Sequence, residues 1–204
     1  MARNDIAAAM GAVIDYKISL INTAIPGVIT KYDAGTKKAE VKPLIKETFW
    51  NGEVLSMPVI VNTPVIFPAT QRGGIIFDLQ AGDTVLIIFS QKSMERWLAS
   101  GKEVEEGVAR HFDLTDGIAI PGLYSFASQN PFPGDDVTVY SNKGRFVINK
   151  DDKVAIGNES AELLDIIDQL ISAIMAAEYG VYPLANPAPF QVLQQLLATI
   201  KGTL

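Results

Sequence analysis

Three short runs of alternating apolar and polar residues lie between residues 135 and 159, and they form the most regular pattern in the chain. The runs cover residues 137–139, 146–148 and 154–156, and the turn-forming segments SNKG and NKDD separate them. Alternation with a period of two residues predicts strands with one apolar face. The side chains expected on that face are Val137, Val139, Phe146, Ile148, Val154 and Ile156.

An even repeat of such short strands is typical of a ribbon rather than a globule. Two or three strands in isolation are only marginally stable in water, so a single chain cannot cover this face by itself. We therefore expect further copies of the same chain to cover it, most simply in a closed ring. A hairpin folded onto the preceding domain is the alternative.

The N-terminal region, residues 1–24, predicts one helix that begins near Asn4 or Asp5 and ends at about residue 22. This helix either packs on its own domain or docks on a partner. Its apolar residues at helical spacing are Ile6, Met10, Val13, Ile14 and Ile21.

Residues 25–122 contain short apolar runs separated by turn signals, which predict a small Greek-key β-barrel of OB type. Asn51-Gly52 is a strong hairpin signal that favours positive φ at both positions. A short helix over residues 92–100 is expected to place Trp97 and Leu98 against the barrel. The main strands expected are residues 38–50, 53–61, 75–77, 84–89 and 117–120.

Residues 123–134, which contain Pro131 and Pro133, predict a linker before the ribbon of residues 135–159. Residues 160–204 then predict an αα-hairpin whose first helix is capped by Ser160 and ends near residue 177. The second helix is expected over residues 190–201 and also carries Leu196 and Ile200. The residues expected to pack these helices are Leu163, Ile167, Leu170, Ile174, Leu193 and Leu197.

Because the ribbon holds copies together, these hairpins are expected to meet near one axis and pack as a cluster of helices. Folding of each hairpin onto its own barrel is the alternative. The predicted fold class is mainly β with terminal helices, namely an OB-type barrel, a ribbon shared between chains and a C-terminal αα-hairpin.

Composition and charge narrow the functional classes. The chain has 204 residues, of which 48% are apolar and 20% charged, so a sizeable core is expected. The net charge of −6 opposes non-specific binding to nucleic acid or anionic membrane. The chain has no cysteine, and no run of eighteen apolar residues predicts a membrane span. Asp5, Asp15 and Lys17 interrupt any secretory apolar region.

No catalytic constellation rises above background in the sequence. The single histidine, His111, has no second histidine to complete a metal site, and the nucleophile motif G-x-S-x-G is absent. Glu103 with Glu105 or Glu106 could form a pair of hydrolytic carboxylates, but a solvated loop is the expected environment. No catalytic residue, cofactor or metal site is therefore expected.

An OB barrel also suggests single-stranded nucleic acid as a ligand. Phe49, Trp50 and Phe77 would then supply stacking surfaces, although core aromatic residues are the alternative. The acidic balance opposes this function.

Two segments of the barrel region carry a resemblance to a known family. They are GGIIFDLQAGDTVLIIFSQKSMERWL and RHFDLTDGIAIPG, and the similarity extends over about residues 24–125. This region resembles the N-terminal domain of central spike proteins from the baseplates of contractile-tailed phages and phage-like particles. The resemblance implies an OB-fold beneath a trimeric tail hub, followed by a three-chain β-helix that points at the cell envelope.

Two features depart from that family. The ribbon has only three strand segments, and no histidine follows position 111 to hold the iron ion that family tips can carry. The ribbon of residues 135–159 is accordingly expected to be a short intertwined trimeric β-helix or prism.

The sequence therefore predicts a structural homotrimer, a central spike that closes the tail hub and transmits thrust for envelope penetration. It is expected in the tail baseplate of a virion assembled in the host cytoplasm. Its expected partners are two further copies of itself and the trimeric hub protein; a separate spike-tip protein is left open. Nucleic acid and stable membrane anchoring are not expected. The alternatives are a tail-associated cell-wall hydrolase and an OB-fold binder of single-stranded nucleic acid.

Overall fold

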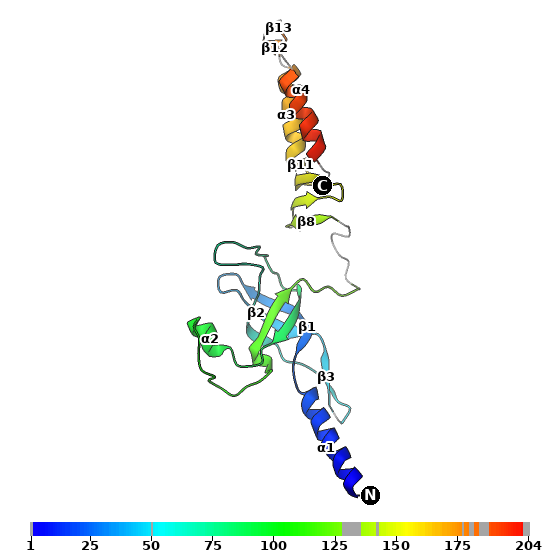
Figure 1. The fold of residues 1–204 in the computed structure, drawn as a ribbon, viewed down its shortest axis with the longest axis vertical. Coiled ribbons are helices and arrows are strands. Elements are labelled where there is room, and N and C mark those ends of the chain that lie inside the picture. Colours follow the sequence, from blue (N-terminus) through cyan, green and yellow to red (C-terminus); the bar gives the residue numbers. More distant parts are fainter. Residues whose placement is uncertain are drawn as a thin grey trace. The chain divides into compact units, whose positions relative to one another are not determined.

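The computed structural model describes residues 2–49, 51–127, 136–141, 143–176, 178–179, 182–183 and 188–201. The chain divides into two compact units, Met1–Ser128 and Gln129–Leu204. Figure 1 shows the elements of both, and each unit is described by itself.

The first element is the helix α1 (Ala2–Ser19). It begins before Asn4 and Asp5, so the prediction that one of them caps the helix is wrong. The large apolar side chains from Ile6 to Ile21 are all exposed, and the helix does not pack on its own domain.

A five-stranded antiparallel sheet forms the body of the first unit, with the strand order β5-β2-β1-β6-β7. The chain just after β5 pairs with β7, the strand at the other edge of the sheet. Val65 forms a parallel bridge with Ala119, and the Ile66 N–H donates to the Ala119 carbonyl oxygen at 3.0 Å. The sheet is thus a curled half-barrel, which confirms a mainly β fold. Its strands are β1 (Ala24–Asp33), β2 (Lys38–Pro43), β5 (Ile60–Pro64), β6 (Thr84–Phe89) and β7 (Gly117–Pro121).

The core of the half-barrel comes from alternate residues of these strands. On β6, Val85 and Ile87 are completely buried, and the alternate residues Thr84, Leu86 and Ile88 are half-buried. The β6 strand is therefore a strand with one core face rather than one buried on both sides. The other buried apolar residues are Ile29, Ala39, Val41, Ile60, Val65, Leu79, Phe89 and Ala119.

The long strand expected over residues 38–50 is divided into β2 and β3 (Lys46–Thr48). Strand β3 forms a hairpin with β4 (Val54–Ser56), as the sequence predicted. The expected turn geometry is wrong, because Gly52 has φ 82° and Asn51 has no positive φ. The Phe49 N–H donates to the Glu53 carbonyl oxygen, so the loop is longer than two residues and only Gly52 needs the left-handed conformation.

Residues 75–77 do not form the expected strand. The Ile75 N–H donates to the carbonyl oxygen of Pro68, and a proline has no N–H to return. A ladder therefore cannot extend along this segment.

The short helix α2 (Glu95–Ser100) does not use its large apolar side chains for packing. Trp97 and Leu98 are 52% and 51% exposed, so their predicted contact with the barrel is wrong. The helix is instead attached through its first turn, where the Met94 N–H donates to the Asp116 carboxylate at 3.0 Å.

The second unit contains a four-stranded antiparallel sheet and a pair of helices. Its strands run across the direction in which the two helices extend, as Figure 1 shows. The C-terminal helices of the predicted fold class are confirmed. The elements are β8 (Val137–Tyr140), β9 (Gly144–Ile148), β10 (Val154–Asn158), β11 (Ala161–Glu162), α3 (Leu163–Ala176), β12 (Glu178–Tyr179), β13 (Tyr182–Pro183) and α4 (Ala188–Ile200). Residues 128–134 of the expected linker lie outside the described residues.

The first turn of α3 is capped by Glu162 and not by Ser160, so that prediction is wrong. The short strand β11 lies between Ser160 and α3. The carboxylate of Glu162, its last residue, accepts a hydrogen bond from the Asp165 N–H at 2.7 Å. The same carboxylate accepts from the Ile156 N–H at 3.0 Å and therefore joins helix to sheet. Gly157 allows β11 to approach, because a Cβ there would lie 2.8 Å from the Cα of Glu162.

Ile87→Ala tests the half-barrel core. Since Ile87 is completely buried, its truncation is expected to lower the free energy of unfolding by about 2–5 kcal/mol. Ile76→Ala is the matched control, because Ile76 is 60% exposed, and a change within about 0.5 kcal/mol is expected. Urea titration followed by tryptophan fluorescence measures both. Equal losses of unfolding free energy in the two variants would contradict the assignment of Ile87 to the core.

Candidate functional site

The six apolar residues expected to form the ribbon core lie on one face of the β8–β9–β10 sheet. Cross-strand pairing places them in two rows, each with one residue from each strand. One row is Val139, Phe146 and Ile156, and the other is Val137, Ile148 and Val154.

The chain covers the opposite face of this sheet. The row on that face is Thr138, Val147 and Ala155, of which Val147 is 6% exposed and Ala155 is completely buried. Helix α3 contacts β10 and β11. The covered face therefore uses the residues between those that the alternating pattern selected.

The face with the two rows remains open in a single chain. Val137 is 63% exposed, Val139 48% and Ile156 39%, while the other three residues are half-buried. Contiguous apolar patches on a protein surface mark sites of interaction. We call the six residues the open sheet face.

The helices α3 and α4 lie side by side (Figure 1). Polar side-chain contacts join them. The Gln194 amide donates to the Asp168 carboxylate at 3.1 Å and to the Ser172 hydroxyl at 2.8 Å. The Lys201 ammonium lies 2.5 Å from an oxygen of Asp165, whose hydrogen bond raises the pKa of Lys201. We call this line of contacts the polar seam.

The residues expected to pack the helices fall into two groups. Leu197 is buried within the hairpin, and Ile167 and Ile174 are half-buried. The remaining three, Leu163, Leu170 and Leu193, are 46%, 58% and 50% exposed.

Sequence reasoning missed Ile166, which is 51% exposed beside Leu163 and Leu170. The spacing of three and four residues from Leu163 through Ile166 to Leu170 is the signal that could have identified it.

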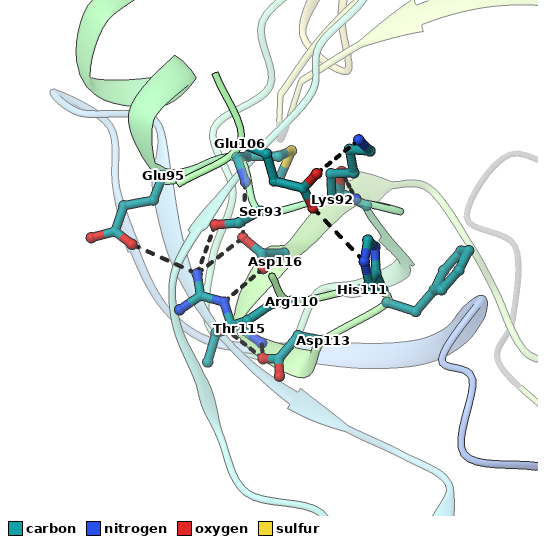
Figure 2. Close-up of polar contacts among 12 residues, drawn as sticks. Lys92, Ser93, Glu95, Glu106, Arg110, His111, Asp113, Thr115 and Asp116 are labelled. Carbon is teal, nitrogen blue, oxygen red and sulfur yellow. Dashed lines mark hydrogen bonds and ion pairs between the residues drawn. The ribbon is translucent and has the colours of Figure 1, made fainter. Parts of the chain in front are cut away.

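A polar cluster in the first unit joins β7 and α2 to the loop between them (Figure 2). Asp116 is 4% exposed and accepts hydrogen bonds from Arg110 Nε at 3.2 Å and from the Met94 N–H at 3.0 Å. Arg110 Nη2 also donates to the Ser93 hydroxyl at 2.9 Å. The bond to Asp116 raises the pKa of Arg110. This cluster positions the loop.

His111 lies at the edge of the same cluster (Figure 2). Its Nδ1 is 2.9 Å from the Gln91 carbonyl oxygen, and its Nε2 is 3.8 Å from Glu106. The Lys92 ammonium donates to Glu106 at 2.9 Å and lowers the pKa of that carboxyl group. Glu103 and Glu105 are exposed. Over the described ranges, no group of three or more histidine, aspartate or glutamate residues is arranged to hold a metal ion.

The structure describes two of the three aromatic residues considered for base stacking, and both are exposed. Phe49 is 39% exposed on the β3–β4 hairpin. Phe77 is 44% exposed, and its ring centroid lies 6.0 Å from that of Phe67. Trp50 lies outside the described residues.

None of the helices in the described part of the chain has the length and apolar character needed to span a membrane.

In the comparison with known proteins, one family model matches part of the chain. Residues 25–122 match the family model of the phage protein Gp138 N-terminal domain, and these residues comprise the curled half-barrel and α2. The match supports a phage structural or tail-related protein and suggests a location in the virion. No curated protein matches the chain.

Asp113→Asn tests the polar cluster through pH. The Thr115 hydroxyl and N–H donate to the Asp113 carboxylate and lower its pKa. A carboxyl whose folded pKa is depressed stabilises the protein above its unfolded pKa of about 3.9, and that contribution is lost as pH falls through the folded pKa. The variant should therefore lose about 0.5–1 kcal/mol at neutral pH.

Between neutral pH and pH 2 the difference in stability between Asp113→Asn and the parent should shrink, because protonation of Asp113 as the pH falls through its folded pKa removes its charge. Urea unfolding at the two pH values measures this difference. Glu103→Gln, on the exposed part of the loop, is the control and should change stability little at either pH. A loss that is equal at both pH values would contradict the electrostatic role of Asp113.

Proposed function

We propose that the chain is the structural central spike of a contractile tail baseplate and that it acts as a homotrimer. Three chains share the open sheet face as a short trimeric β-helix or prism. The first unit, an OB-type domain, meets the trimeric hub protein at the end of the tail. The particle is assembled in the host cytoplasm, and the protein stays in the virion.

The observation that carries this proposal is the pair of apolar rows on the open sheet face. Each row runs across all three strands without a polar residue, and the chain itself covers only the opposite face. Three copies around an axis would remove both rows from water. At about 25 cal/mol per Å² of apolar area, such burial is a strong driving force for association.

The topology of the half-barrel supports the OB-type assignment. The first three strands of this sheet along the chain, β1, β2 and β5, pair as a meander, and β6 pairs with the free edge of β1. The parallel bridge between Val65 and Ala119 then joins the two edges of the sheet. An OB-fold is a partly open five-stranded Greek-key barrel, and this arrangement agrees with it.

The proposed mechanism is mechanical. Strands that run across the long direction of the second unit form successive layers, and their hydrogen bonds lie along that direction (Figure 1). A trimer built from such layers resists compression because its cross-strand bonds and its shared apolar core act together. Such a spike closes the hub and transmits the thrust of sheath contraction to the cell envelope.

Val139→Asp tests the shared face. Val139 is 48% exposed in one chain, so the substitution costs a single chain little. In the trimer, three carboxylates would meet in an apolar core, where desolvation and like charge oppose them. We expect light scattering to show loss of the trimer, while circular dichroism retains the signal of folded chains.

Lys150→Asp is the matched control, because Lys150 is exposed in the turn after β9 and is not one of the six residues of the open sheet face. It should leave the trimer intact. A trimer that survives Val139→Asp would contradict the shared face.

A purely mechanical role predicts that His111 is dispensable for chemistry. His111 contacts the Gln91 carbonyl and Glu106, which fix the loop. We expect the purified protein to leave the turbidity of a peptidoglycan suspension unchanged, with or without His111→Ala. Clearing by the parent protein that is lost in the folded variant would support the cell-wall hydrolase instead.

A further inference from the structure

The α3–α4 hairpin has an exposed apolar side in addition to the open sheet face. Three residues of each helix form it, and they recur at intervals of three and four positions. They are Leu163, Ile166, Leu170, Leu193, Leu196 and Ile200, all of which are 46–59% exposed. We call them the hairpin stripe.

The hairpin stripe lies on the side of the hairpin away from the polar seam. At 100° per residue, the stripe and the seam are about 160° apart around α3 and about 120° apart around α4. On each helix the buried contact residue, Ile171 or Leu197, falls between them. The hairpin therefore has one polar side with satisfied contacts and one apolar side open to solvent.

The hairpin is attached to the sheet at both of its ends. Glu162 accepts hydrogen bonds from Ile156 of β10 and from Asp165 of α3. At the other end, Lys201 forms a parallel bridge with Val154 of β10. Because both attachments are on the strand that supplies two residues of the open sheet face, the orientation of the hairpin follows that of the sheet.

We propose that the hairpin stripe is a second interface between copies of this chain, in which three hairpins pack as a six-helix bundle. This inference rests on the proposed trimer, because the shared sheet brings the three hairpins to one axis. The occupant is a further copy rather than another protein, since the stripe is continuous in the chain with the sheet that the copies share. The spacing of three and four residues is the one that packs helices side by side. Such a bundle would give the trimer a blunt C-terminal end.

The test uses the absence of cysteine from the chain. Leu170→Cys and Leu196→Cys each place one thiol in the stripe, on α3 and α4 respectively. Gln169→Cys and Gln195→Cys are the matched controls, because both neighbouring residues are exposed and polar. Each purified full-length variant is labelled with a maleimide under native conditions, and its mass in solution is measured in the same sample.

We expect the stripe thiols to react at least tenfold more slowly than the control thiols in samples that are trimeric, because a buried thiol is poorly accessible. Only copies of this chain are present, so protection in the trimer identifies the occupant. Equal labelling rates in a trimer would overturn the bundle and leave the proposed function standing. A monomer with fast labelling would overturn the proposed trimer itself. A monomer with protected thiols would show that the hairpin folds onto its own chain, which also overturns the bundle.

Discussion

The constraint on which the second unit depends is the difference between the two faces of one small sheet. Val147 and Ala155 are buried against the chain itself, whereas Val137 and Val139 on the other face are exposed. In a single chain, the apolar rows of the open sheet face therefore stay in contact with water, which is unfavourable. The association proposed above would remove these rows from water and so stabilise the folded second unit.

The first unit buries an apolar core within a single chain. Its half-barrel encloses its own cluster of buried residues, and a parallel bridge joins the edges of its sheet. Exposed apolar side chains of this unit lie on α1 and on the β3–β4 hairpin, where Leu55 is 47% exposed, and also on α2 and in the loops. The half-barrel therefore needs no second chain to bury its core. In the proposed trimer, the ribbon is the part whose apolar face is covered by other copies of the chain.

The sequence predicted the elements whose signals are local. Alternation alone placed Val139, Phe146 and Ile156 on the same face, because a period of two residues leaves no other choice once the strands form. The helices at both ends followed from the helical spacing of their apolar residues. The curled sheet followed from turn signals between short apolar runs.

What the sequence did not predict depends on partners distant in the chain. Trp97 and Leu98 looked like core residues, but the Met94 N–H bond to Asp116 attaches α2 and leaves both exposed. Glu162 was missed as a helix cap because its role needs the pairing of β10 with β11. Local propensity carries no information about such contacts, and tertiary structure decides them.

The central claim is that the protein is a trimer whose chains share one face. Analytical ultracentrifugation of the unmodified protein at micromolar concentration and moderate salt tests it most directly. The account predicts one species at three times the chain mass of 22.1 kDa, and no dissociation as salt is raised, because the shared face is apolar. A folded monomer of 22.1 kDa at the same concentration would contradict it.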